Sequence, residues 1–187
     1  VLGPDGKMFK TRDGGTVTLD QLLDTAEETA AAPVALAAVK YADLSTSLHK
    51  DYVFDAARMT QTTGNTGPYL QYAHARTSKI LREAEARGLA PQQTQVTVLA
   101  EPDEQLLALH LTRYPQVVAT LAEELQPHKL CTYLFDLASL YSTFYEQCPV
   151  LRSDGEVRHS RLALCQATRQ VLASGLGLLG IAAPDAM

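Results

Sequence analysis

Residues 127–145 read PHKLCTYLFDLASLYSTFY, and their apolar side chains return every three or four positions. The positions concerned are Leu130, Tyr133, Leu134, Leu137, Leu140, Tyr141, Phe144 and Tyr145. This spacing places them along one side of an α-helix, which is typical of a long helix packed against a core. Pro127 suits the first turn of that helix, where a backbone N–H would have no partner. The segment therefore predicts an all-α protein.

Helix signals continue on both sides of this segment. Thr18 and Gln21 have the spacing of a capping box, Pro68 suits a first helical position, and Gly88 suits a helix end. The predicted helices cover 19–31, 34–48, 68–87, 104–114, 115–125, a long segment from Pro127, and 156–173. Helices that begin at proline or capping residues and carry apolar stripes favour a helical bundle.

Three segments have weaker helical signals. Residues 1–15 are rich in glycine and predict a loop. Residues 50–59 are ambiguous, because Tyr52 to Phe54 favour an extended piece while Asp55 can cap a following helix. Three glycines after residue 173 are expected to loosen the end of the chain; they are Gly175, Gly177 and Gly180.

Composition limits the classes of function. The chain has 187 residues, 46% of them hydrophobic and 20% charged, enough to bury the core of one domain. Its formal net charge of −5 argues against binding nucleic acid by bulk charge, so any such role requires a local basic face. No apolar run is long enough to span a membrane. The odd count of 3 cysteines favours buried thiols over a disulfide framework or a zinc site, and we predict no metal site.

The first candidate site is the loop sequence Lys7-Met8-Phe9-Lys10-Thr11. Two lysines three positions apart, in a loop flanked by glycines, can place two ammonium groups on one polyphosphate. A mobile loop would allow that contact to form in the transition state. The alternative is an ordinary solvated pair of lysines.

The second candidate is the predicted helix 68–87. Arg76, Lys79 and Arg82 form one basic ridge on it, and Tyr69, Tyr72 and His74 precede the ridge. A basic ridge near aromatic rings suits an RNA backbone and an unstacked base. The alternative is a solvated helix face with tyrosines in the core. Arg158 and Arg161 suggest a second, smaller basic cluster. Most aromatic residues of 133–145 are expected in the core. The alternative, that one or two of them are exposed and stack on bases, stays open.

Five segments together resemble one protein family. They are VLGPDGKMFKTR (1–12), AVKYADLS (38–45), KDYVFD (50–55), GNTGPYLQYAHAR (64–76) and SRLALCQAT (160–168). The first resembles the Lys-Met-Ser-Lys-Ser region of class I aminoacyl-tRNA synthetases, in its arginyl-tRNA synthetase version. The others are similar to later parts of that family, in the same order.

The resemblance implies an all-α helical bundle of the class I synthetase anticodon-binding type. Residues 1–62 would be the tail of the catalytic domain, with the lysine loop and connecting helices. Residues 63–187 would be the anticodon-binding domain. The chain would then be the C-terminal part of a ligase that attaches arginine to its tRNA using ATP as its magnesium complex. Lys7 and Lys10 would be catalytic, and Lys7, Met8 and Lys10 would contact ATP.

The resemblance also implies partners for the chain. These are the arginine tRNA and an N-terminal catalytic part of the same protein, in a cytoplasmic enzyme that we expect to be a monomer. The implied tRNA-binding residues are Tyr69, Gln71, Tyr72, His74, Arg76, Lys79, Arg82, Arg158 and Arg161.

Two features depart from the family pattern. Phe9 stands where the class has serine, and no His-Ile-Gly-His motif or nucleotide-binding βαβ pattern occurs in the sequence. These residues alone are therefore expected to be inactive in aminoacylation. The alternative function is a stand-alone, non-catalytic module derived from this scaffold, binding RNA or protein.

Overall fold

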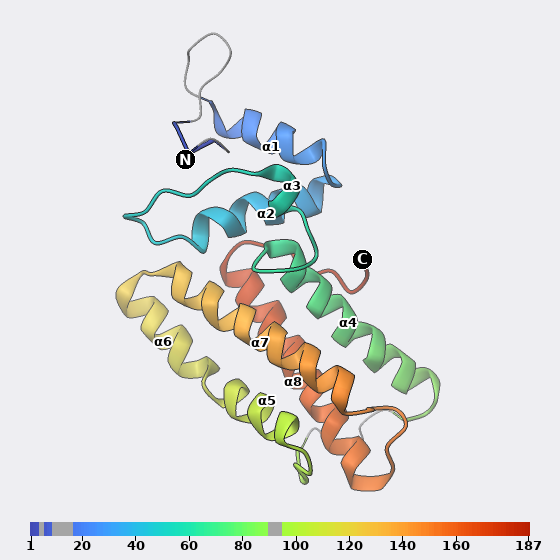
Figure 1. The fold of residues 1–187 in the computed structure, drawn as a ribbon. Coiled ribbons are helices and arrows are strands. Elements are labelled where there is room, and N and C mark those ends of the chain that lie inside the picture. Colours follow the sequence, from blue (N-terminus) through green and yellow to red (C-terminus); the bar gives the residue numbers. More distant parts are fainter. Residues whose placement is uncertain (4–5, 9–16, 90–94) are drawn as a thin grey trace.

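The computed structural model describes residues 1–3, 6–8, 17–89 and 95–187. Within these residues it has 8 α-helices and no strand, apart from isolated bridges that join Leu2 to Met8 and to Val53. The first three helices form a small upper layer, and the other five form a bundle beneath it (Figure 1). The predicted all-α class is therefore confirmed.

The upper layer contains α1 (Leu19–Glu27), α2 (Ala32–Leu44) and α3 (Ala56–Met59). The predicted capping box is present: Gln21 N donates to Thr18 Oγ1, and Thr18 N donates to Gln21 Oε1 at 3.0 Å. Asp55 caps α3 as expected. The layer has its own small core, made of Leu22, Ala26, Ala35, Ala38, Val39, Phe54, Ala56 and Met59.

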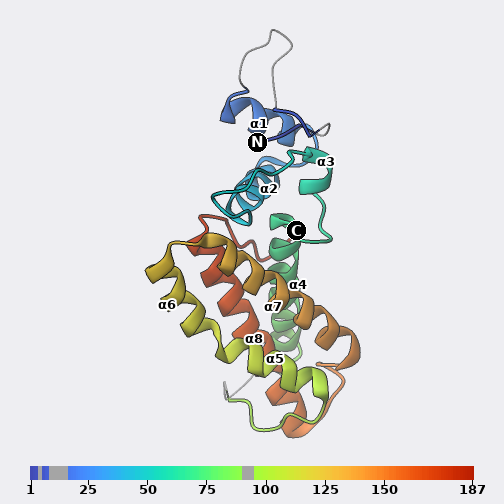
Figure 2. The same ribbon diagram turned by 60° about the vertical axis from the view of Figure 1, so that its left-hand side comes forward.

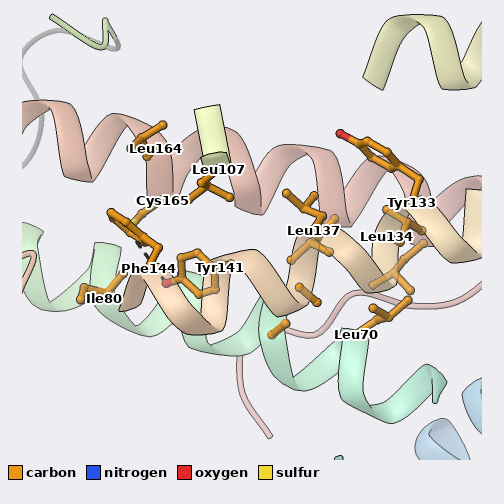
Figure 3. Close-up of a cluster of buried hydrophobic side chains, with 14 of the residues drawn as sticks. Leu70, Ile80, Leu107, Tyr133, Leu134, Leu137, Tyr141, Phe144, Leu164 and Cys165 are labelled. Atoms are coloured by element: carbon orange, nitrogen blue, oxygen red, sulfur yellow. Dashed lines mark hydrogen bonds between the residues drawn. The ribbon is translucent and has the colours of Figure 1, made fainter. Parts of the chain in front are cut away.

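The bundle contains α4 (Gly67–Ala86), α5 (Pro102–Thr112), α6 (Tyr114–Glu124), α7 (Pro127–Gln147) and α8 (Gly155–Leu178). The predicted stripe on α7 lies in the core of this bundle, where Leu134, Leu137 and Tyr141 have no exposed surface (Figure 3). Tyr145, at the end of the stripe, is instead 38% exposed. The three cysteines are free and buried, as predicted.

A close contact joins the two layers. Gly67, in the first turn of α4, lies so near α2 that an added Cβ would be 2.4 Å from the carbonyl oxygen of Ala37. Tyr41 of α2 is buried and donates its hydroxyl to Asn65 Oδ1 at 2.6 Å and to the carbonyl of Cys131 at 3.1 Å. The upper layer is thereby attached to the start of both α4 and α7.

The end of α8 differs from the prediction. The helix continues through Gly175 and Gly177 to Leu178, so these glycines do not loosen the chain. Gly175 serves close packing, because a Cβ there would lie 2.5 Å from Leu134 Cδ2. Gly180 ends the helix with a φ of +66°, a conformation that glycine adopts without a steric cost. After this turn the chain runs back beside α4 (Figures 1 and 2).

Candidate nucleic-acid interface

An arginine held between two aromatic rings is the centre of the candidate site. The Arg76 guanidinium carbon lies 4.8 Å from the ring centroid of Tyr72 and 5.2 Å from that of Tyr145. Arg76 Nη2 also donates to the Tyr72 hydroxyl at 3.1 Å. Tyr72 precedes Arg76 by one turn of α4, and Tyr145 comes from the end of α7. The guanidinium is therefore fixed in place while both rings keep exposed surface.

A pocket of about 360 Å³ opens beside this arginine. Its walls come from α4, from the end of α7 and from the last residues of the chain. They are Tyr72, Ala75, Arg76, Lys79, Arg82, Tyr145, Glu146, Asp185, Ala186 and Met187. The structure thus brings together the whole predicted ridge and one of the predicted tyrosines. The pocket combines cationic donors, aromatic surface and the carboxylates of Glu146 and Asp185, a set that can hold a flat polar ring and an adjoining phosphate.

Charge at the site shifts the titration of Tyr72. The hydrogen bond from Arg76, with the positive charges of Arg76 and Lys79, lowers the pKa of Tyr72 below its usual 10.0. The phenol oxygen therefore already lies in a positive field, and the same field attracts the phosphates of a nucleic acid.

Two of the predicted RNA-contact residues are buried and make hydrogen bonds within the protein. Gln71 and His74 are 1% and 3% exposed. Gln71 Nε2 donates to the carbonyl of Ala182 at 2.9 Å, and His74 Nδ1 donates to that of Pro184 at 2.8 Å. The prediction that they face RNA is corrected: both side chains point toward the C-terminal segment that runs back beside α4. Tyr69 is half-buried against Phe135, with ring centroids 5.8 Å apart.

The expected second basic cluster does not form a surface patch. Arg161 is 6% exposed and makes an ion pair with the buried Glu104 of α5. Arg158 is half-buried and donates to the carbonyl of Ser153 at 3.0 Å. Both side chains hold the turn before α8: Arg161 Nη1 also donates to Ser153 Oγ at 2.6 Å, and Arg158 Nη1 lies 3.7 Å from Asp154 Oδ1. Charge alone misidentified both arginines, because it does not reveal these partners.

The lysine loop can be described only in part. Lys7 and Met8 are exposed, and the Gly3 N–H donates to the Lys7 carbonyl at 2.7 Å. The Leu2 N–H donates to the carbonyl of Tyr52 at 2.9 Å, which ties this segment to the extended piece after α2. Lys10, the second predicted catalytic lysine, lies outside the described residues.

Sequence reasoning did not single out one part of the pocket and missed another. Tyr145 is one of the aromatic residues of 133–145, of which one or two were left open as exposed, but it shares the periodicity of the core residues. Asp185, Ala186 and Met187 have no sequence pattern that indicates a site. Their role depends on the turn at Gly180, which returns the chain to α4.

Two other features are absent from the described residues. Among the described residues, no group of three His, Cys, Asp or Glu side chains could hold a metal ion. Within the same residues, no helix combines the length and apolar character needed to cross a membrane.

Comparison with known proteins identifies the bundle. The family described as "DALR anticodon binding domain" matches residues 70–187. The arginine–tRNA ligase of Cutibacterium acnes is 64% identical over 197 residues, which cover 100% of this chain and 35% of that protein. The arginine–tRNA ligase of Thermobifida fusca is 47% identical over 208 residues, covering 100% of this chain and 36% of that protein.

A solved structure supports the same assignment. The arginyl-tRNA synthetase of Thermus thermophilus superimposes with a TM-score of 0.82 at 34% identity, over 100% of this chain and 34% of that one. This chain therefore spans about a third of the length of its relatives. The expected fold type is confirmed, and no comparison favours the alternative of a stand-alone module. The chain belongs to the DALR anticodon-binding domain family, in the form found in arginine–tRNA ligases.

Proposed function

We propose that this chain binds the anticodon arm of an arginine tRNA for an arginine–tRNA ligase. The whole ligase would activate arginine with ATP and pass the arginyl group to the tRNA. The family match over the bundle and the 64% identity to a ligase support this proposal. The observation that carries it furthest is the pocket of α4, α7 and the chain end, with Arg76 held between two exposed tyrosines.

The pocket suits one unstacked base and the phosphates beside it. Tyr72 and Tyr145 are 39% and 38% exposed, so each can offer ring surface to a base. Lys79 and Arg82 are exposed at the same wall and can contact phosphates. The net charge of −5 is compatible with this role because the pocket lining gathers three cationic side chains against the two carboxylates of Glu146 and Asp185.

For the lysine loop we retain the role implied by the family. Lys7 and Lys10 would neutralise the pyrophosphate released from magnesium ATP, and Met8 would contact the nucleotide. A catalytic part elsewhere in the same protein would supply the arginine pocket and most of the ATP site. We further propose that the complete enzyme is a cytoplasmic monomer.

The test compares two RNAs on this chain at low and moderate salt. One is a full arginine tRNA transcript and the other is the same tRNA without its anticodon loop. We expect the full tRNA to bind more tightly, and its affinity to fall as salt rises. Equal affinity for both RNAs, or no binding at low salt by the folded chain, contradicts the proposal.

Two variants locate the binding to the pocket. Tyr145→Ala removes an exposed ring and should weaken binding by about 1–3 kcal/mol, the usual contribution of one stacked base. Lys129→Met is the matched control: Lys129 is partly exposed, pairs with Glu124, and lies near the opposite end of α7. Its binding should stay close to that of the parent chain.

A further inference from the structure

The last segment of the chain is bound along one face of α4. Ile181 is 4% exposed and fixes the start of this segment in the core. Beyond it, the carbonyls of Ala182 and Pro184 accept from Gln71 and His74. Arg82 Nη1 then donates to the carbonyl of Asp185 at 2.8 Å. Because Gln71, His74 and Arg82 lie on one face of the helix, the segment follows α4 toward the pocket.

Asp185 is the point where this segment is joined to two helices. Ser78 Oγ of α4 donates to Asp185 Oδ1 at 2.7 Å, and Arg169 Nη2 of α8 donates to the same oxygen at 3.0 Å. Arg169 Nε also donates to Ser78 Oγ at 2.9 Å. The three side chains form a closed set, here called the tail clasp. Hydrogen bonds from Ser78 and Arg169 lower the pKa of Asp185, consistent with a carboxylate that stays ionised in this position.

We propose that the tail clasp of Asp185, Ser78 and Arg169 positions Ala186 and Met187 as a wall of the pocket and thereby sets its affinity for RNA. This inference rests on the proposed function. Arg169 acts through Asp185, because Arg169 does not line the pocket whereas Asp185, Ala186 and Met187 do. Arg169 and Ser78 are therefore positioning residues.

The change in RNA affinity depends on the fraction of time that Ala186 and Met187 stay in position as the pocket wall. The clasp residues Arg169 and Asp185 are 42% and 56% exposed, so their ion pair alone is weak and solvent competes with it. If loss of the clasp leaves the wall in place about a tenth of the time, the dissociation constant rises about tenfold.

The decisive variant is Asp185→Asn, because two explanations predict opposite results. Electrostatics alone predicts tighter RNA binding, since the change removes a negative charge from a pocket wall. The tail clasp predicts weaker binding by about tenfold, since a neutral amide oxygen accepts from Arg169 more weakly than the carboxylate does. The probe is an RNA hairpin with the anticodon stem and loop of an arginine tRNA, bound to the 187-residue chain.

A second readout follows the wall directly. The backbone ¹⁵N heteronuclear NOE of Ala186 and Met187 should be that of ordered backbone in the parent chain and should fall in Asp185→Asn. Arg169→Met, which keeps an aliphatic stem but removes the guanidinium, should lower both the NOE and the affinity. Lys129→Met removes one positive charge away from the pocket and should change neither.

The outcomes separate the two proposals. If the parent chain fails to bind the hairpin, the proposed function and this inference both fail. If the parent binds and Asp185→Asn binds equally or more tightly, only the tail clasp is refuted. The same holds if the NOE falls while affinity is unchanged, because the wall would then be irrelevant to binding.

Discussion

At the residue scale, Arg76 shows how a few contacts convert a charged side chain into a fixed group. A lone arginine on a helix is usually mobile and solvated. Here its hydrogen bond to Tyr72 and its position between the rings of Tyr72 and Tyr145 hold the guanidinium at the pocket wall. A cation held in this way loses less entropy when it binds a ligand than a free one does.

The pKa of Tyr72 provides a test of its contact with Arg76. Arg76→Met removes the hydrogen bond and the charge that lower the pKa of Tyr72, so this pKa should rise toward 10.0. Ultraviolet absorbance of phenolate against pH measures it, with Tyr72→Phe used to identify the contribution of Tyr72. An unchanged difference titration would show that Arg76 does not lie on the ring.

At the scale of elements, α7 is the centre of the bundle. It contacts α4, α5, α6 and α8. Figure 3 shows large apolar side chains of its inner face beside those of α4, α5 and α8. The contact with α8 is close because Gly175 admits the side chain of Leu134. The position of Tyr145 at the pocket is thus set by packing along the whole length of α7.

Leu137, in the middle of α7, tests this packing. It has no exposed surface, so Leu137→Ala should lower the free energy of unfolding by about 2–5 kcal/mol. Leu109→Ala on α5 is the matched control, since Leu109 is 63% exposed and its loss should change stability by less than about 0.5 kcal/mol. Urea denaturation measures both; equal effects would contradict the assignment of the α7 stripe to the core.

Gly175 tests the contact between α7 and α8. Alanine is the better helix former, so Gly175→Ala would stabilise an isolated helix by about 0.5–1 kcal/mol. In this bundle the new Cβ meets Leu134 Cδ2 at 2.5 Å, and we expect destabilisation by about 1–3 kcal/mol. Gly177→Ala is the control, because nothing lies within 4 Å of its added Cβ. A higher melting temperature for Gly175→Ala would refute the close approach.

At the scale of the whole molecule, local patterns predicted the helices well and the partners of side chains poorly. Apolar periodicity, prolines and caps located the helices, because each signal acts within a few residues. The partners of Gln71 and His74 lie 111 and 110 residues away, and Glu104, the ion-pair partner of Arg161, lies 57 residues away. No local signal carries that information, so two buried polar residues and one buried arginine were predicted as RNA contacts.

The same reasoning explains which part of the site was predictable. Arg76, Lys79 and Arg82 lie on one helix, and helical spacing was enough to group them. The remaining walls need the end of α7 and the returning chain end, which meet α4 only in the folded bundle. The site therefore depends on the tertiary fold, and its affinity should be lost when the bundle unfolds.

The most direct test of the RNA-binding pocket is chemical-shift mapping on the ¹⁵N-labelled chain during titration with the anticodon hairpin of an arginine tRNA. The largest shifts should occur at Tyr72, Lys79, Tyr145 and Met187, and they should disappear when the hairpin loop is replaced. Saturable shifts confined to other faces of the bundle, such as α6, or no shifts at low salt, would contradict the account.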